Sequence, residues 1–367
     1  MTQGVSGWRN DDRWARAAGD DDPTQPSAAG AIGARGASRP REVQDSRDVP
    51  QLPEVPLPRG FTEVAGSRRL ETAPRVDARD AETRRRLDSF MAAMSEPYRM
   101  PDGTTVPVTP AFRMSAPYRA QVASLSSPAI VAELASAASR AHVSPEALGR
   151  IESGRGTPRE IHSLTQALID GHPLPRDGVW SGAAVRQLMF DHGIGIDCAG
   201  YVQQAFLHAS GITRAQAGFD SPINESLSGL ERRGFAKVND MSAVRPGDLV
   251  VLAAPPGQPG HRAIVYDQHP ATANDMSYLL QGDAPARDFS VGGQVRVFEV
   301  DTSWGCNGQA RLGGVRRETW WLNESTNKWG YIERSLDKKT GAELELFRAV
   351  DGPYDHRLEG FFHRKGV

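Results

Sequence analysis

Apolar residues recur at helical spacing in the middle of the chain. In Asp80–Met94 they fall at Leu87, Phe90, Met91 and Met94. A period of three to four residues is typical of a helix with one buried face. The same reasoning, with Ser and Pro at helix starts, predicts further helices at 126–140, within 142–169, at 181–193 and from Cys198 onward.

Short apolar runs bounded by turn residues follow in the second half of the chain. Pro246 and Gly247 form a turn before the first of them, and such runs are typical of strands. The predicted strands are Leu249–Ala253, Ala263–Tyr266, Tyr278–Gln281, Gln294–Val300 and Val315–Leu322. Helices followed by strands indicate an α+β fold with an antiparallel sheet.

Residues 1–88 have a different composition. Ala, Gly, Pro, Arg and Asp dominate there, and large apolar residues are few. Such a segment buries too little surface to offset its ordering entropy, so we predict a disordered leader or linker. Its Pro-rich stretch Gln51–Gly60 is a candidate docking motif. The chain is thus divided into a leader at 1–88, a helical region at 89–170 and a domain at 171–367.

A candidate nucleophile lies where the helix after Asp197 begins. Cys198 is followed by the small residues Ala199 and Gly200, which leave room for a substrate near the sulfur. A helix N-terminus favours negative charge and lowers the pKa of a thiol. Cys198 is therefore either a reactive thiol or a buried structural cysteine. A disulfide with Cys306, the other cysteine of the chain, is a further alternative.

His261 opens the second predicted strand and supplies a possible base. A thiol and an imidazole form a catalytic pair when the ring takes the thiol proton and then passes it to the leaving amine. The order of Cys198 and His261 in the sequence is compatible with such a pair.

Three motifs in this order resemble the NlpC-type cysteine peptidases, papain-like enzymes that cut peptidoglycan stem peptides. D-C-A-G-Y resembles the run around the family's nucleophile, R-P-G-D-L-V the strand before its histidine, and G-H-R-A-I-V-Y the strand that carries the histidine. The resemblance implies a papain-like core within 171–367, Cys198 as nucleophile, His261 as general base and then acid, and no cofactor.

The resemblance also implies a third residue that orients the imidazole. In V-F-E-V-D-T-S-W the family's position falls on Asp301, and a carboxylate there stabilises imidazolium. Ser303 and His269 are the alternatives. Substrate contacts are expected from residues beside the two motifs, namely Asp197, Gly200, Tyr201, Ser303 and Trp304. The oxyanion is expected at the backbone amide of Cys198.

The segment Val143–Pro158 resembles the recognition-helix half of Cro/repressor-like helix-turn-helix proteins. A cluster of cations is missing beyond Arg150, Arg155 and the adjacent Arg159, and the formal net charge of the chain is -2, so we do not expect nucleic acid as a partner. A helical packing region is the favoured interpretation. A regulator with a degenerate Cys domain stays open, as does glycan cleavage through Glu152.

The remaining sequence features concern metals, membranes and delivery. Histidines such as His356 and His363 lack metal-ligand spacing. His192 is interpreted as a positive charge that interacts with the dipole at a helix C-terminus, so no metal site is predicted. No apolar run approaches the ~18 residues of a membrane span. No signal peptide begins the chain, so we expect synthesis in the cytoplasm.

The function predicted from these features is hydrolysis of peptidoglycan peptides. The chain is then a toxin or wall-opening effector whose leader loads it into a contractile injection system or phage-like particle, with an immunity protein as a possible partner. A papain-like protease, deamidase or acyltransferase acting on proteins is the alternative, because the fold alone does not decide the target.

Overall fold

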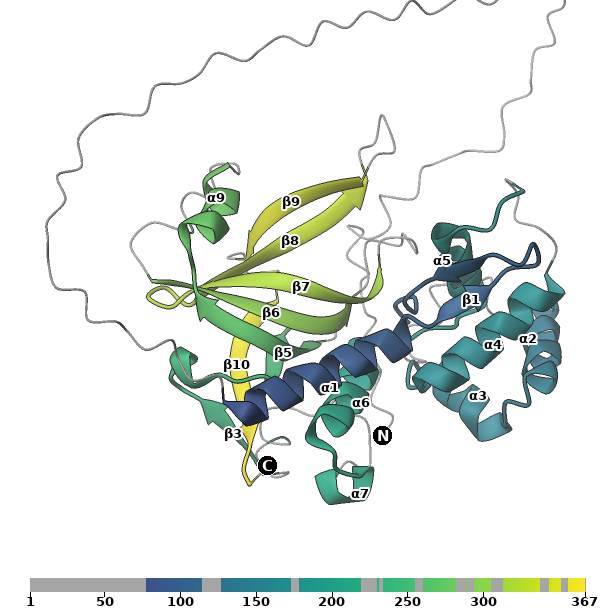
Figure 1. Ribbon diagram of the computed structural model, residues 1–367, viewed down its shortest axis with the longest axis horizontal. Helices are drawn as coiled ribbons and strands as arrows, with labels where there is room; N and C mark the ends of the chain where they lie inside the picture. The colour runs from purple at the N-terminus through teal and green to yellow at the C-terminus, as the bar shows by residue number, and fades with distance from the viewer. Residues whose placement is uncertain are drawn as a thin grey trace, which may run out of the picture. The chain divides into compact units, whose positions relative to one another are not determined.

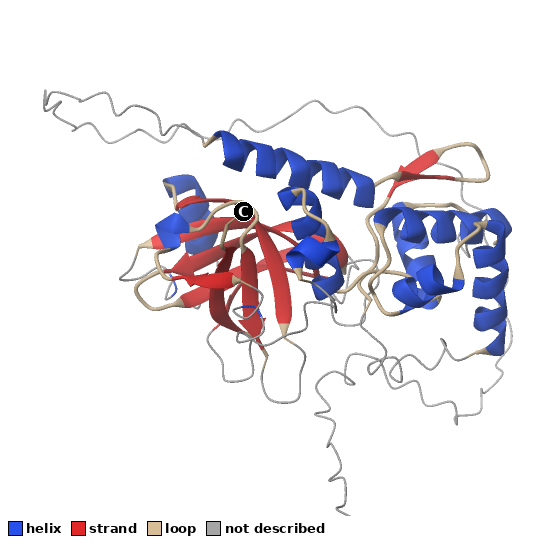
Figure 2. Cartoon of the chain, turned by 90° about the horizontal axis from the view of Figure 1, so that it is seen from below, coloured by secondary structure: helices blue, strands red, loops and turns tan. Residues whose placement is uncertain are grey.

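The structure of the chain is a computed structural model. It describes residues 77–113, 127–172, 178–218, 230, 234–254, 260–281, 289, 294–304, 313–336, 343–350 and 356–366. Most of the predicted leader, the Pro-rich stretch and Cys306 lie outside these residues. Figure 2 distinguishes the helices, in blue, from the strands, in red.

Helices dominate the first half of the described chain. They are α1 (Ala78–Met94), α2 (Pro128–Arg140), α3 (Pro145–Glu152), α4 (Pro158–Gly171), α5 (Gly182–Asp191), α6 (Cys198–Ser210) and α7 (Arg214–Ala217), with a small hairpin of β1 (Pro97–Arg99) and β2 (Thr105–Pro107) after α1. Their starts follow from local capping: the side chain of Ser144 accepts from the amide of Ala147, and Thr157 and Glu160 form a capping box.

An antiparallel sheet of eight strands forms the second half. Its strands are β3 (Phe235–Val238), β4 (Leu249–Ala253), β5 (His261–Pro270), β6 (Val295–Trp304), β7 (Gly314–Asn323), β8 (Lys328–Leu336), β9 (Glu343–Val350) and β10 (Arg357–Arg364). Their order is β3-β10-β4-β5-β6-β7-β8-β9 (Figure 1). A 3-10 turn (Met241–Ala243) precedes β4, and α9 (Ala273–Gln281) connects β5 to β6.

Buried apolar residues lie on both faces of the sheet. On one face α6 contributes Tyr201, Val202 and Phe206 to a cluster, here called the helix-side core, that includes Val251 and Ile264 of the sheet. The second cluster, here called the far-side core, holds among others Val250, Leu252, Ala263, Val265, Trp320 and Trp329. Successive strand residues thus alternate between the two cores, which determines the face on which each candidate residue lies.

The helical region and the sheet share the helix-side core. Leu87 and Phe90 of α1, Ile151 of α3 and Leu164 of α4 belong to the same cluster as Tyr201, and α1 packs along α6 (Figure 1). α1 therefore extends across the boundary predicted at residue 88, and the helix-side core includes residues on both sides of the boundary predicted at residue 170.

The α+β class and the antiparallel sheet are confirmed. Four of the five predicted strands lie within β4, β5, β6 and β7. The prediction for Tyr278–Gln281 is wrong, because these residues end α9. None of the described helices combines the length and apolar character that a bilayer crossing requires.

Candidate active site around Cys198

Cys198 is the first residue of α6. The side chain of Asp197 caps the helix by accepting from the amide of Gly200 at 2.6 Å. The thiol is free and half-buried. Its sulfur accepts a hydrogen bond from the backbone N–H of Arg262, the residue directly after His261. The thiol therefore lies beside the start of β5.

The capping residue is held from behind by the turn between α3 and α4. The guanidinium of Arg155 binds the carboxylate of Asp197, and the amide of Asp197 donates to the carbonyl of Gly154 at 3.1 Å. Gly154 has a φ of 74°, and a Cβ on Gly200 would overlap the Gly154 carbonyl. The close approach of this turn explains why residue 200 is a glycine. The turn fills the space beside Gly200, so the opening for a substrate that the sequence suggested is not present there.

The thiol of Cys198 holds its proton more tightly than an ordinary cysteine. Burial, followed by the negative charge of Asp197, raises its pKa to about 11. The N–H and charge of Arg262 and the charge of Arg155 act in the opposite direction and are weaker. The sequence-based expectation of a lowered pKa is not met, because desolvation outweighs the effect of the helix N-terminus.

His261 lies on the far side of its own strand. Its Nε2 is 2.9 Å from the Thr302 hydroxyl, and its ring centroid is 3.7 Å from that of Trp304. The Thr302 hydroxyl donates its hydrogen to the carbonyl of Arg262 at 2.9 Å. Thr302 therefore accepts from Nε2–H, and Nδ1 is the nitrogen with the free lone pair.

Burial is the main reason why the pKa of His261 lies well below its usual value, and the charges of His356, Arg262 and Arg316 add to it. No hydrogen bond joins His261 to Cys198, although both residues are described. The ring contacts Thr302 and Trp304, whereas Cys198 begins α6, which packs on the opposite face of the sheet. In this conformation they are a neutral thiol and a neutral imidazole, not an ion pair.

The residue that binds the His261 ring is Thr302, and none of the three candidates from the sequence does so. The carboxylate of Asp301 points to the opposite face of β6, where Arg317 binds it at 2.7 and 3.1 Å. Ser303 donates to the carbonyl of Ile196 at 2.7 Å, and His269 lies 3.2 Å from Asp275. The segment was predicted as a strand and forms β6, but the sequence did not indicate which of its side chains faces His261.

The residues expected to touch substrate have other partners in the structure. Tyr201 is fully buried and packs against Phe90 with a ring separation of 5.5 Å. Asp197 is buried as the cap of α6, and Gly200 packs on the Gly154 turn. Trp304 is the exception, since it is partly exposed and lies directly against His261.

The motif Val143–Pro158 comprises α3 and the turn into α4. Arg150 binds Glu160 and Arg155 binds Asp197, so both arginines of the motif form ion pairs within the chain. Arg159 is exposed on α4. The residues of the motif are thus accounted for by contacts within the fold. They offer little positive charge to a nucleic acid.

Comparisons with known proteins do not assign the site. No protein-family model matches the chain, and no curated protein or solved structure gives a significant match.

Proposed function

We propose that the chain is a thiol hydrolase with a papain-like core, in which Cys198 attacks an amide carbonyl of a peptidoglycan stem peptide. The observation that carries the proposal is the hydrogen bond from the Arg262 amide to the Cys198 sulfur. Arg262 directly follows His261, whose Nε2 lies 2.9 Å from the Thr302 hydroxyl. The motif resemblance provides the substrate class.

The reaction begins with proton transfer from the thiol to Nδ1 of His261, for which the imidazole has to leave the far-side core and reach the face of the sheet on which α6 lies. The sulfur attacks the carbonyl carbon, and the tetrahedral oxyanion is stabilised by amides at the N-terminus of α6, including that of Cys198. His261 then gives its proton to the leaving amine as the C–N bond breaks. Water hydrolyses the thioester and regenerates the thiol.

The resting arrangement is a protected one. A thiol with a raised pKa and an imidazole with a lowered pKa do not exchange a proton spontaneously. Substrate binding beside Trp304, which contacts the His261 ring, is the event that moves the ring in this proposal. Thr302 acts as a positioning residue, because it keeps the proton on Nε2 and the lone pair on Nδ1.

Delivery is part of the same proposal. A wall-cutting enzyme made in the cytoplasm has to reach its substrate, and the segment before α1 is the proposed loading segment for an injection apparatus. The contacts of Arg150 and Arg155 within the chain favour this hydrolase over the regulator that the Val143–Pro158 motif suggested.

The test is digestion of defined muropeptides by the full chain, followed by mass spectrometry. We expect Cys198→Ala to abolish product formation while its circular dichroism and unfolding midpoint stay near those of the wild type. Thr302→Val is expected to lower kcat by about 10- to 100-fold, and Thr302→Ser, which keeps the hydroxyl, is the matched control. Undiminished turnover by Cys198→Ala would disprove the assignment, and cleavage of protein substrates alone would reassign the target.

A further inference from the structure

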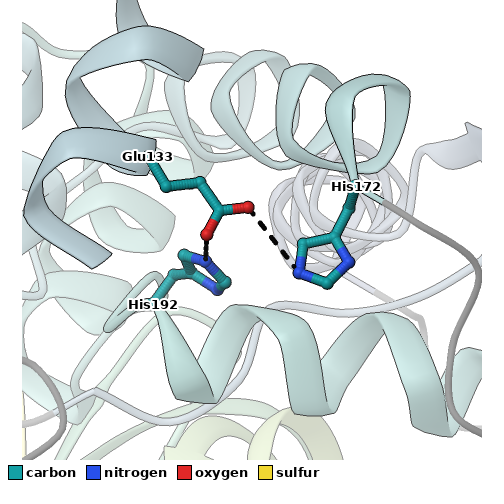
Figure 3. A group of neighbouring side chains, drawn as sticks. All are labelled: Glu133, His172 and His192. Atoms are coloured by element: carbon teal, nitrogen blue, oxygen red, sulfur yellow. Dashed lines mark hydrogen bonds and ion pairs between the residues drawn. The ribbon is translucent and has the colours of Figure 1, made fainter. Parts of the chain in front are cut away.

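Three side chains from distant parts of the sequence meet in the helical region (Figure 3). Glu133 belongs to α2, His172 is the C-cap of α4 and His192 is the C-cap of α5. One carboxylate oxygen lies 3.1 Å from Nε2 of His192, and the other lies 3.6 Å from Nε2 of His172. The potential ligand atoms all lie within 4.8 Å of one another.

The orientation of His192 shows that a cation is needed between the ring and the carboxylate. Its Nδ1 lies 2.9 Å from the carbonyl of Leu188, which only accepts hydrogen bonds, so Nδ1 carries a hydrogen. In the neutral ring the Nε2 lone pair then faces the carboxylate oxygen of Glu133. Two acceptors at 3.1 Å repel each other unless a proton or a metal ion lies between them.

The surroundings favour a metal ion. A backbone carbonyl that accepts from the second ring nitrogen is the usual support of a metal-bound histidine. His172 and His192 both stand at helix C-termini, where the negative end of the helix dipole attracts a cation. His192 is buried, whereas the side chains of Glu133 and His172 are 37% and 30% exposed, so an ion has a path from solvent.

The donor set identifies the class of ion. Two imidazole nitrogens and one carboxylate are typical of Zn²⁺ and related late transition metals, whereas Ca²⁺ and Mg²⁺ prefer oxygen ligands. Ligand atoms around a tetrahedral Zn²⁺ are about 3.3 Å apart, and the three potential ligand atoms, one from each residue, lie within 4.8 Å of one another, so the side chains have to move closer together to bind the ion. Three protein ligands leave the fourth position for water.

We propose that Glu133, His172 and His192 bind a divalent transition-metal ion of the Zn²⁺ class, which ties the ends of α4 and α5 to α2. The site is independent of the thiol chemistry, because its ligands are not part of the surroundings of Cys198. Within the part of the chain that the structure describes, it is the one His and carboxylate group with three potential ligands.

The test is Zn²⁺ titration of the chelator-treated full chain, measured by calorimetry and by the shift in thermal midpoint. We expect one ion per chain, a rise in the midpoint, and an affinity at least about 100-fold lower in Glu133→Gln and in His172→Gln. Both substitutions are at partly exposed side chains. Co²⁺ in place of Zn²⁺ is expected to give the visible absorption of a tetrahedral site in the wild type only.

Two controls separate this site from other donors. His269→Gln breaks a histidine–carboxylate pair, with Asp275, outside the cluster, and Cys198→Ala removes a thiol. Both variants are expected to bind Zn²⁺ as the wild type does. If Glu133→Gln binds as tightly as the wild type, or if Zn²⁺ leaves the wild-type midpoint unchanged, a proton joins Glu133 to His192 and the proposal is wrong.

Discussion

The carboxylate of Asp197 binds the guanidinium of Arg155, a residue 42 positions earlier in the sequence. Both side chains are buried. The contact attaches the turn between α3 and α4 to the residue that caps the Cys198 helix, so two motifs that are separate in the sequence depend on each other in the fold.

Removal of Arg155 should be strongly destabilising. Arg155→Ala leaves the Asp197 carboxylate buried without its charge partner, and such losses cost about 3–5 kcal/mol. Burial already raises the pKa of Asp197 to about 6 despite the opposing charge of Arg155. Urea unfolding measures the change. Arg159→Ala, at an exposed position of α4, should change stability by less than about 0.5 kcal/mol, and equal effects of the two variants would contradict the structure.

Two glycines in the same motif should respond in opposite directions. Gly154→Ala places a Cβ 2.7 Å from the carbonyl oxygen of Arg113 at a φ of 74°, and we expect a loss of about 2–4 kcal/mol. Gly149 lies in α3, and a Cβ added there would have no atom of another element within 4 Å, so Gly149→Ala should stabilise the chain by about 0.5–1 kcal/mol. Thermal unfolding of the two variants checks both signs.

The Cys198 thiol should react slowly with iodoacetamide at neutral pH. Its pKa of about 11 means that the folded protein keeps the proton between pH 9 and 11, where an unfolded chain releases it. Alkylation of Cys198, followed by peptide mass spectrometry, should accelerate toward pH 11, and the free energy of unfolding should fall over the same range. Rapid labelling at pH 7 would show that the thiolate is already present.

Two histidines should have pKa values on opposite sides of the ordinary histidine pKa. The pKa of His363 is raised, first by its hydrogen bond to Asp248 at 2.7 Å, whereas burial lowers that of His261. NMR titration, with His261→Gln and His363→Gln for assignment, should find His363 protonated above pH 6.5 and His261 neutral well below it. His363 therefore stabilises the fold below pH 6.5 and loses this effect as the pH rises, whereas His261 destabilises it as the pH falls below 6.5.

Local patterns in the sequence predicted most helices and strands, but not which of them lie next to each other in the fold. The helices from α1 to α6 and strands β4 to β7 follow from periodicity and capping signals. The α9 segment was misassigned because a short apolar run such as Tyr278–Gln281 suits a strand or a helix equally. Likewise, V-F-E-V-D-T-S-W indicates a strand, but it does not state whether Asp301 or Thr302 faces His261, since this depends on the register with β5.

Sites assembled from distant segments were the least predictable. Glu133, His172 and His192 come from three helices and have no motif spacing, so only the packing of α2, α4 and α5 brings them together. Arg155 likewise resembles a surface cation in the sequence, and its burial depends on the approach of Asp197 in the folded chain.

The position of β10 has a consequence for how the protein is made. Since β10 lies between β3 and β4, β3 has no described strand beside it until residues 357–364 have left the ribosome. The edges of β3 and β4 then remain available to other chains while the residues between β4 and β10 are synthesised, and unpaired edges promote aggregation. Early arrival of a chaperone, or slow translation of this interval, would thus affect the yield of folded protein more than it would for a sheet built from neighbouring hairpins.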